Sequence, residues 1–286
     1  MANEIYDLSL PKRITNPVVF SSPHSGRDYP AAFVEKSALA KNRLRSSEDA
    51  FVDDLFAQVV DYGAPLLAAN FPRAYVDLNR RPDELDPGIV EDAKTRFNNP
   101  RIASGLGVIP RVVAKGRQIQ TGKITMQRAM ARIECCYHPY HALLAELLVQ
   151  ARQRFGLAVL IDCHSMPSEA LQNTMPPGRR RPDVVLGNRY GASADKDVSN
   201  IVETAFKDQG FVVGRNTPFA GGYITQKYGV PSKGQHVVQV EINRGLYMDE
   251  DRIVRNTAFD TVKAQLSRAS QDICHKLRPA IPLAAE

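Results

Sequence analysis

Two apolar stretches of the sequence each run into a histidine that is followed by a serine. Residues 157–161 are Leu-Ala-Val-Leu-Ile and lead to His164, and residues 18–20 are Val-Val-Phe and lead to His24. An apolar run bounded by glycine and proline, like the one before His164, is typical of a strand buried on both faces of a sheet. A histidine at the carboxyl end of such a strand can bind a metal ion or act as a general base. A single one can equally be a core histidine satisfied by hydrogen bonds, but the repeated pattern favours a functional site.

A third polar residue that could take part in catalysis is Glu241, which lies inside the alternating segment 236–243. In a strand, Glu241 shares one face with Val237 and Gln239, while the other face is apolar except for His236. A glutamate in such a strand costs free energy unless it is paired. Glu241 is therefore a candidate general base, and the alternative is an internal salt bridge to an arginine.

Other polar residues allow two interpretations each. Asp49 precedes an expected helix and can form a capping box with Ser46, which satisfies the amides of the first turn. His138 and His141 lie near the start of another expected helix, where they can pack or cap, or share a face as metal ligands. These alternatives stay open from the residues alone.

A possible anion clamp follows the expected strand 74–78. Asn79 and Arg80 stand at its end, and a guanidinium group offers a planar, bidentate fork to a carboxylate. Arginines are also common on solvated surfaces, so this pair alone is a weak indication.

Two other kinds of chemistry receive little support. Cys163 and His164 are adjacent in a strand, so they point to opposite faces and cannot form a Cys-His hydrolase pair. The glycine pair in residues 217–225 lacks the spacing of a P-loop lysine and does not lead into a clear helix, which favours a mobile flap near a site.

Alternating strands and helices must position these side chains. We expect strands at residues 18–22, 64–69, 74–78, 157–166, 183–187, 211–213 and 236–243, and helices at 50–62, 139–155, 194–209 and 251–277. Residues 83–124 predict a long surface excursion with a short hairpin near 109–119, and Pro176–Gly178 predicts a further loop. With no linker and no repeat, the sequence predicts one α/β domain over residues 1–286, with a mixed sheet flanked by helices.

Composition excludes several classes of protein. The chain has 286 residues, of which 43% are hydrophobic and 24% are charged, as in ordinary globular proteins. Its net charge of +6 is moderate, and Arg179–Arg181 stand in a Pro/Gly loop without aromatic residues, so we expect no nucleic-acid partner. The sequence has no signal peptide and no apolar run long enough to span a membrane, so we expect a cytoplasmic protein. The four cysteines lack CxxC spacing, which indicates reduced thiols.

Six segments together resemble the N-formylglutamate amidohydrolase family. They are Ser22–Arg27, Glu48–Leu55, Arg73–Arg80, Leu160–Met166, Gly221–Tyr223 and Gln239–Met248, and the similarity runs from about residue 16 to 260. That family is related in fold to zinc carboxypeptidases and to the deacylases of succinylglutamate and acetylaspartate. The resemblance therefore implies a zinc-carboxypeptidase-like fold.

The resemblance also implies a metal site. His24 and His164 would bind one zinc ion, or another divalent metal, and Glu241 would be the general base. The carboxypeptidase relatives take their metal carboxylate three residues after the first histidine, where this chain has Arg27, which cannot bind zinc. We therefore expect Asp49 as the third ligand, with Glu48 as the alternative.

By the same resemblance, Asn79 and Arg80 would bind a carboxylate of the substrate. Further candidates for substrate binding, which the sequence does not rank, are Arg73, Arg189, Tyr223 and Arg244. The implied activity is hydrolysis of N-formyl-L-glutamate to formate and L-glutamate, a step of histidine degradation, or of a related N-acyl acidic amino acid. The alternatives are a carboxypeptidase-like enzyme, a deacylase of other specificity, and a non-catalytic relative that only binds a ligand.

Overall fold

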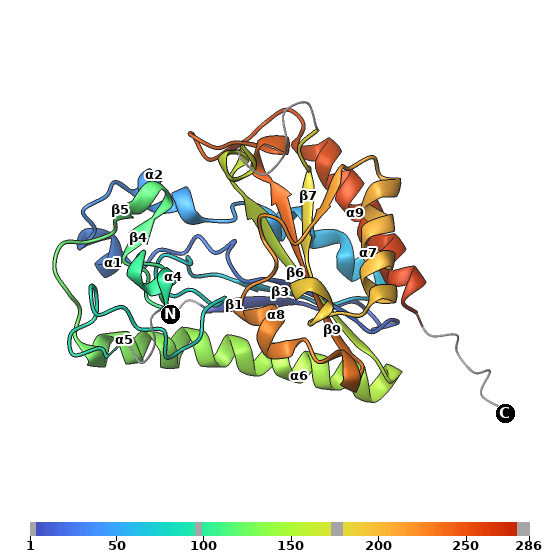
Figure 1. Cartoon of the computed structure of the whole chain (residues 1–286), viewed down its shortest axis with the longest axis horizontal. Coiled ribbons are helices and arrows are strands. Elements are labelled where there is room, and N and C mark those ends of the chain that lie inside the picture. Colours follow the sequence, from blue (N-terminus) through green and yellow to red (C-terminus); the bar gives the residue numbers. More distant parts are fainter. Residues whose placement is uncertain (1–3, 95–98, 173–179, 279–286) are drawn as a thin grey trace.

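The computed structural model describes residues 4–94, 99–172 and 180–278, and in these residues seven strands form one mixed sheet (Figure 1). Their order across the sheet is β1 (Tyr6–Ser9), β3 (Leu66–Ala69), β2 (Val18–Ser22), β6 (Ala158–Met166), β9 (Gln235–Asn243), β7 (Val184–Gly187) and β8 (Val213–Arg215). The four central strands β3, β2, β6 and β9 run parallel, whereas β1 and β7 are antiparallel to β3 and β9. The mixed α/β sheet expected from the sequence is thus confirmed.

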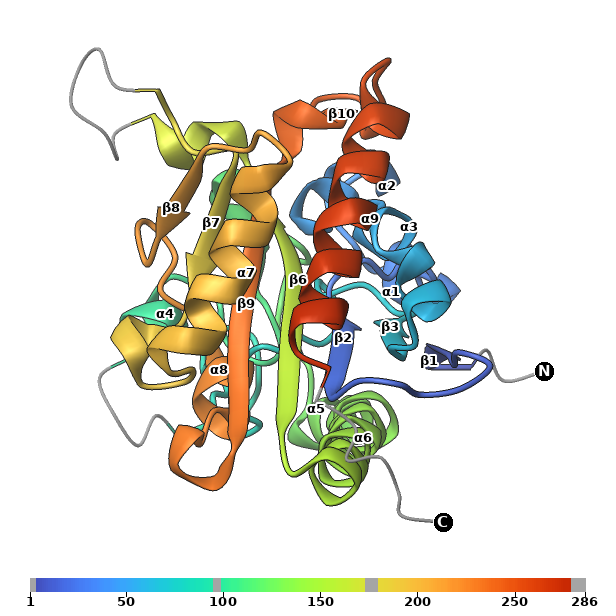
Figure 2. The ribbon, with the colours of Figure 1, turned by 90° about the vertical axis from the view of Figure 1, so that its right-hand side faces the viewer.

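Three long helices cover the two faces of the sheet. Figures 1 and 2 show α6 (His138–Phe155) on one side, and α7 (Lys196–Asp208) with α9 (Phe259–Lys276) on the other. Leu144 of α6 shares one hydrophobic core with Leu160, and Val202 of α7 shares the other with Val240. Because the central strands are covered on both faces, their backbone and most of their side chains are buried, as their apolar composition predicts.

Shorter elements surround this framework. They are α1 (Ala31–Glu35), α2 (Lys41–Leu44), α3 (Val52–Leu55), α4 (Pro100–Ala103), α5 (Met126–Arg132), α8 (Tyr223–Tyr228), and the two-residue strand pairs β4 (Val112–Val113) with β5 (Arg117–Gln118) and β10 (Met248–Asp249) with β11 (Val254–Arg255). Helix α5 continues through a π-helical turn, Ile133–Tyr137, directly into α6. The pair β4 and β5 confirms the hairpin predicted near residues 109–119.

Two expected elements are wrong in type or length. Residues 74–78 form no strand: Tyr75 donates its backbone N–H to Pro72 instead, although Val76 and Leu78 are fully buried as an apolar segment should be. The expected helix 50–62 is broken into α3 and a 3₁₀ helix, Ala57–Tyr62, and Phe51 before it has a left-handed backbone with φ of 67°. Periodicity located the buried side chains correctly but not the hydrogen bonds between backbone groups.

The other differences concern where elements begin. Helix α9 starts at Phe259 and not at residue 251, because the Asp249 carboxylate accepts the N–H groups of Asp251 and Arg252 and closes a turn between β10 and β11. Strand β8 starts at Val213, and the glycine pair does lead into a short helix, α8. The loop predicted at Pro176–Gly178 lies outside the described residues. Within the described part of the chain, no helix is long and apolar enough to cross a membrane.

Candidate functional site

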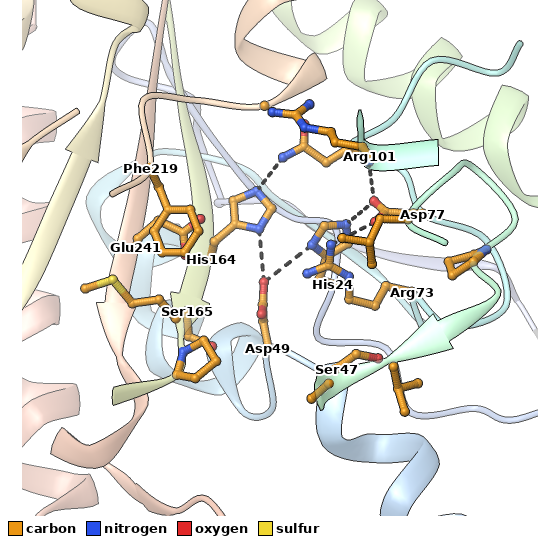
Figure 3. Close-up of a pocket in the computed structure, with 18 of the residues that line it drawn as sticks. His24, Ser47, Asp49, Arg73, Asp77, Arg101, His164, Ser165, Phe219 and Glu241 are labelled. Carbon is orange, nitrogen blue, oxygen red and sulfur yellow. Dashed lines mark hydrogen bonds and ion pairs between the residues drawn. The ribbon is translucent and has the colours of Figure 1, made fainter. Parts of the chain in front are cut away.

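A cavity of about 770 Å³ lies at the carboxyl ends of the central strands. His24, Asp49, His164 and Glu241 all line it, so the structure brings together side chains from four separate segments (Figure 3). His24 follows β2, His164 lies near the end of β6, and Glu241 lies opposite His164 on β9 in the parallel register. The carboxyl edge of the sheet is therefore where the polar strand ends meet, as the two strand–histidine patterns suggested.

His24, Asp49 and His164 surround one point in this cavity. The Nδ1 atom of His164 lies 3.0 Å from Asp49 Oδ2, and the Nδ1 atom of His24 lies 3.5 Å from the same oxygen. One ligand atom of each residue lies within 4.8 Å of the other two, and all three residues are buried. Two imidazoles and a carboxylate at this spacing could hold a metal ion with room for a further ligand.

Two more carboxylates orient the histidine rings. The Nε2 of His24 lies 2.8 Å from Asp77 Oδ1, and the Nε2 of His164 lies 3.0 Å from Asp162 Oδ2. Because a carboxylate only accepts, each of these contacts places a proton on Nε2 and turns Nδ1 toward Asp49. Carboxylates bonded to the outer nitrogen of metal-binding histidines are common, since they fix the tautomer and the orientation of the ring.

The donor atoms fit a divalent metal ion. The Nδ1 of His24 is buried and has no hydrogen-bond partner among the described residues, although buried polar atoms are normally paired. An imidazole nitrogen with a free lone pair, next to a carboxylate oxygen, is the kind of ligand atom that a metal such as Zn²⁺ requires.

The charges of this group depend on one another. Burial opposes the charged form of Asp49, but the histidines and the Arg244 guanidinium outweigh it and hold the pKa of Asp49 well below its usual range. Burial likewise opposes the charged form of His164, yet Asp162 and Asp49 raise its pKa well above the usual value. Arg244 Nη2 lies 2.8 Å from Asp49 Oδ1. The metal-free site is therefore held together by ion pairs, and metal binding would displace the proton on His164 Nδ1.

Glu241 is in a different electrostatic state. Burial raises its pKa to about 7, and the negative charge of Asp49 raises it too. The positive charges of His164, Arg73 and Arg244 lower the pKa and partly oppose this effect. Its Oε1 accepts a hydrogen bond of 2.7 Å from Gln239, and it has no ion pair with an arginine among the described residues. The structure thus shows no salt bridge of Glu241 within the described residues, and the carboxyl group can exchange a proton near neutral pH.

Asn79 and Arg80 line the same cavity. Asn79 Nδ2 lies 3.4 Å from His164 Nε2, and its Oδ1 accepts the N–H of Ile224 at the start of α8. Arg80 is largely buried and donates to the backbone carbonyls of Asn79 and Leu106. Arg73 and Arg244 line the cavity too, but each is bonded to a carboxylate of the site, Asp77 and Asp49 respectively.

Other expected site residues lie elsewhere. Arg189 is not part of the cavity lining, and neither is Tyr223, whose ring packs at the edge of the His141 ring. Glu48 is bonded to Arg45 and Tyr29, so the structure favours Asp49 over this alternative.

The structural alternatives for two other residues are settled as well. The capping box is wrong, because Ser46 donates to the Arg43 carbonyl while the Asp49 side chain faces the histidines. His141 is no metal ligand: Nε2 lies 2.9 Å from the Leu78 carbonyl and Nδ1 lies 2.9 Å from the Tyr228 hydroxyl.

Several residues of the site were not found by sequence reasoning. Asp77 and Asp162 had a detectable signal, since each is a carboxylate within two residues of a suspected polar strand end. Tyr137 had none: its hydroxyl donates from the π-helical turn to the Arg80 carbonyl, and so, with His141, fixes the backbone that carries Asn79 and Arg80. Arg101, Gln239 and Ser165 also line the cavity.

The arrangement could serve a hydrolase, because the two histidines and Asp49 could hold a metal ion beside the buried carboxyl group of Glu241. Comparison with known proteins agrees with this class. The model of the N-formylglutamate amidohydrolase family matches residues 16–248, so the chain belongs to that family.

Individual relatives match nearly the whole chain. The N-formylglutamate deformylase of Pseudomonas aeruginosa is 30% identical over 269 residues, which are 93% of this chain and 92% of that protein. The N-formylglutamate deformylase of Pseudomonas putida is 29% identical over 268 residues, again 93% of this chain and 92% of that protein. The crystal structure of N-formylglutamate amidohydrolase from Ralstonia eutropha JMP134 is 36% identical with a TM-score of 0.89, and the match covers 96% of this chain and 98% of that one. The Agrobacterium tumefaciens gene product Atu2144 shares the fold, with a TM-score of 0.64 and 17% identity. The match covers 93% of this chain and 95% of that one.

Asp49 and Glu48 form a matched pair for testing the metal site. We expect Asp49→Asn to lower zinc affinity at least about 10-fold, because a neutral amide is a poor ligand, while its oxygen can still accept from Arg244. Glu48→Gln should keep the affinity, since the Glu48 carboxylate is bonded to Arg45 and Tyr29 and does not line the cavity. Zinc titration against a chelator of known affinity measures both variants. Equal affinity of Asp49→Asn and the wild type would exclude Asp49 as a ligand.

The raised pKa of Glu241 predicts a pH-dependent stability of the metal-free protein. Its pKa is about 7 in the folded chain and near 4.5 in the unfolded chain, so the folded state binds more protons between these values. Stability from this group is therefore lost as pH rises from about 4.5 through 7. Relative to the wild type, metal-free Glu241→Gln should gain stability as pH rises, on the order of 3 kcal/mol at pH 8 and little at pH 4.5. Urea unfolding at both pH values measures the change, with Glu91→Gln at an exposed site as control; a gain independent of pH would contradict it.

Proposed function

We propose that this protein is a metal-dependent amidohydrolase that converts N-formyl-L-glutamate to formate and L-glutamate. Membership in the N-formylglutamate amidohydrolase family supports the reaction, and the relatives named for it match over nearly their whole length. The observation that carries the proposal is the buried group of His24, Asp49 and His164 with Glu241 on the neighbouring strand. Its proposed setting is histidine degradation in the cytoplasm.

His24 and His164, through Nδ1, and Asp49, through Oδ2, are the proposed ligands of one zinc ion or another divalent metal. Such an ion supplies Lewis-acid polarisation of the amide carbonyl and a lowered pKa for water. Asp77 and Asp162 would hold one proton of each ring on Nε2, which directs Nδ1 of both imidazoles to the metal side once His164 Nδ1 has given up its proton. The positive charge of Arg244 stabilises the ionised form of Asp49.

Glu241 is the proposed proton carrier of the hydrolysis. Cleavage of the amide removes a proton from the attacking water, forms a C–O bond to the formyl carbon, breaks the C–N bond and adds a proton to the leaving nitrogen. A carboxyl group can take up the first proton and deliver the second. Burial brings the pKa of Glu241 to about 7, which makes both its ionised and its protonated forms accessible near neutral pH. The hydrogen bond from Gln239 fixes the orientation of the carboxylate.

Asn79 and Arg80 are the proposed site for the α-carboxylate of the substrate. Both are held rigidly, since Tyr137 and His141 bind the backbone carbonyls of Arg80 and Leu78. Arg80 has two of its donors on backbone carbonyls and leaves one terminal nitrogen, Nη2, without a partner among the described residues. A rigid guanidinium next to the reacting centre orients the substrate at little cost in entropy.

A substrate screen tests the proposed reaction. The zinc-loaded protein should release formate from N-formyl-L-glutamate with a higher kcat/KM than it shows for release of the acyl group from N-acetyl- or N-succinyl-L-glutamate. Treatment with a chelator should abolish the activity, and added zinc should restore it. Activity only on a different acyl group, or full activity without metal, would overturn the proposal.

The role of Glu241 is tested by an isosteric change. Glu241→Gln should retain zinc and substrate binding while kcat falls on the order of 100-fold or more, because an amide cannot carry a proton between water and the leaving nitrogen. The matched control is Glu48→Gln, which changes a buried carboxyl group outside the cavity. Normal kcat per zinc-loaded molecule of Glu241→Gln would exclude the role.

A further inference from the structure

The cavity contains more positive charge than its own carboxylates neutralise. Among the described residues, five arginine and lysine side chains line it: Arg73, Arg80, Arg101, Lys115 and Arg244. Arg73 is bonded to Asp77 and Arg244 to Asp49, while Lys115 lies 3.8 Å from Glu169 at the exposed rim. These three cations have partners in the protein, so two arginines remain.

Arg101 has no partner for its guanidinium group in the part of the chain that the structure describes. It lies on α4, where its backbone N–H donates to the Asn99 side chain and its carbonyl accepts from the Leu106 N–H, so its hydrogen bonds involve only backbone groups of Arg101 among the described residues. In the view of Figure 3, Arg101 lies on the side of His164 opposite Asp49. The side chain is exposed at the mouth of the cavity, where a ligand can reach it.

Arg80 lies deeper, and its charge is only weakly compensated. Its closest carboxylate oxygen, Asp77 Oδ2, is 4.0 Å from Nε and is also bonded to Arg73 at 2.8 Å. Burial lowers the pKa of Arg80, and the nearby charge of Arg101 contributes to the same shift. Two cations that repel each other within one cavity are stabilised when an anion binds between or beside them.

We propose that Arg101 binds the side-chain carboxylate of the substrate and thereby selects acidic N-formyl amino acids. This inference rests on the proposed function and adds a residue to it. The α-carboxylate is attached to the carbon that bears the scissile nitrogen, so it must bind close to the metal ligands, where Arg80 lies. The side-chain carboxylate is separated from that carbon by two methylene groups and reaches outward, where Arg101 offers its free bidentate fork.

This assignment also resolves which basic residue serves the second carboxylate. Of the sequence-based candidates, Arg73 and Arg244 are bonded to carboxylates of the site, and Arg189 does not line the cavity. Removing Arg73 or Arg244 from its partner would leave a buried charge unpaired, which is costly. Arg101 can bind a carboxylate without breaking an ion pair to any residue that the structure describes.

The test compares two substrates that differ only in this carboxylate. N-formyl-L-glutamine has nearly the same shape as N-formyl-L-glutamate but a neutral side chain. The wild type should prefer the glutamate derivative about 10- to 100-fold in kcat/KM, the range expected for a charge-assisted hydrogen bond. Arg101→Gln should lose most of this preference through a higher KM for the glutamate derivative, with kcat changed less than about threefold and kcat/KM for the glutamine derivative nearly unchanged. Arg101→Lys should recover part of the preference.

Lys115→Gln is the matched control, because it removes another cation at the mouth of the cavity. It should keep the wild-type preference. A binding measurement gives an independent readout: calorimetric titration of the metal-free protein with N-formyl-L-glutamate should give a Kd that rises at least about 10-fold in Arg101→Gln and not in Lys115→Gln. The melting temperatures of both variants verify that they are folded.

Different failures have different meanings. If the wild type hydrolyses N-formyl-L-glutamate but Arg101→Gln keeps its preference, or loses activity equally on both substrates, the Arg101 subsite is wrong and the proposed reaction stands. A loss of preference in Lys115→Gln instead would assign the carboxylate to Lys115 and likewise overturn the inference. If the wild type hydrolyses neither substrate, the proposed function fails, and the subsite fails with it.

Discussion

The candidate site depends on one buried negative charge, the carboxylate of Asp49. An isolated carboxylate in this position would be strongly destabilising, because Asp49 is completely inaccessible to solvent. The charge is tolerated because Oδ2 faces both histidines and Oδ1 accepts from Arg244. These partners follow β2, lie on β6 and follow β9, so a single carboxylate connects distant segments of the chain at the edge of the sheet. The same arrangement leaves one imidazole lone pair, on His24 Nδ1, free to bind a metal ion.

The parallel register of the central strands supplies the rest of the geometry. Since β6 and β9 pair His164 with Glu241, a potential ligand and a potential proton carrier are neighbours on one face of the sheet. The opposite face at the same level carries Cys163 and Val240, which belong to the hydrophobic core under α7 and α9. Alternation along a strand therefore lets one segment build the site with one residue and stabilise the fold with the next. The adjacent cysteine is excluded from the chemistry for this reason.

The sequence predicted those parts of the site that a single strand determines. His24, His164 and Glu241 were predicted because polar residues at the ends of apolar strands, or inside them, break a simple local pattern. Most of the central strands and the helices α6 and α7 were predicted for the same reason. Arg101 was missed because its place in the cavity depends on contacts between segments, and nothing in its own neighbourhood distinguishes it from other charged residues. Asp77 and Asp162 each lie within two residues of a suspected polar strand end, so the sequence did contain a local signal for them. Residues 74–78 were misassigned because burial, and not hydrogen bonding in a ladder, produces their apolar pattern.

The buried carboxyl groups of the cavity are held in two opposite states, and this difference follows from their partners. Asp49 faces two histidines and Arg244, and Asp77 faces His24, Arg73 and Arg80; these partners outweigh the cost of burial and keep both pKa values low. Glu241 has only the amide of Gln239 as a bonded partner, so burial dominates and its pKa rises to about 7. Carboxylates that stay ionised suit the binding and orientation of metal ligands, whereas one that gains and loses a proton near neutral pH suits proton transfer. In the proposed function these tasks are separated by the placement of the arginines: Arg73 and Arg244 are bonded to the carboxylates with lowered pKa values, and no arginine is bonded to Glu241 within the described residues.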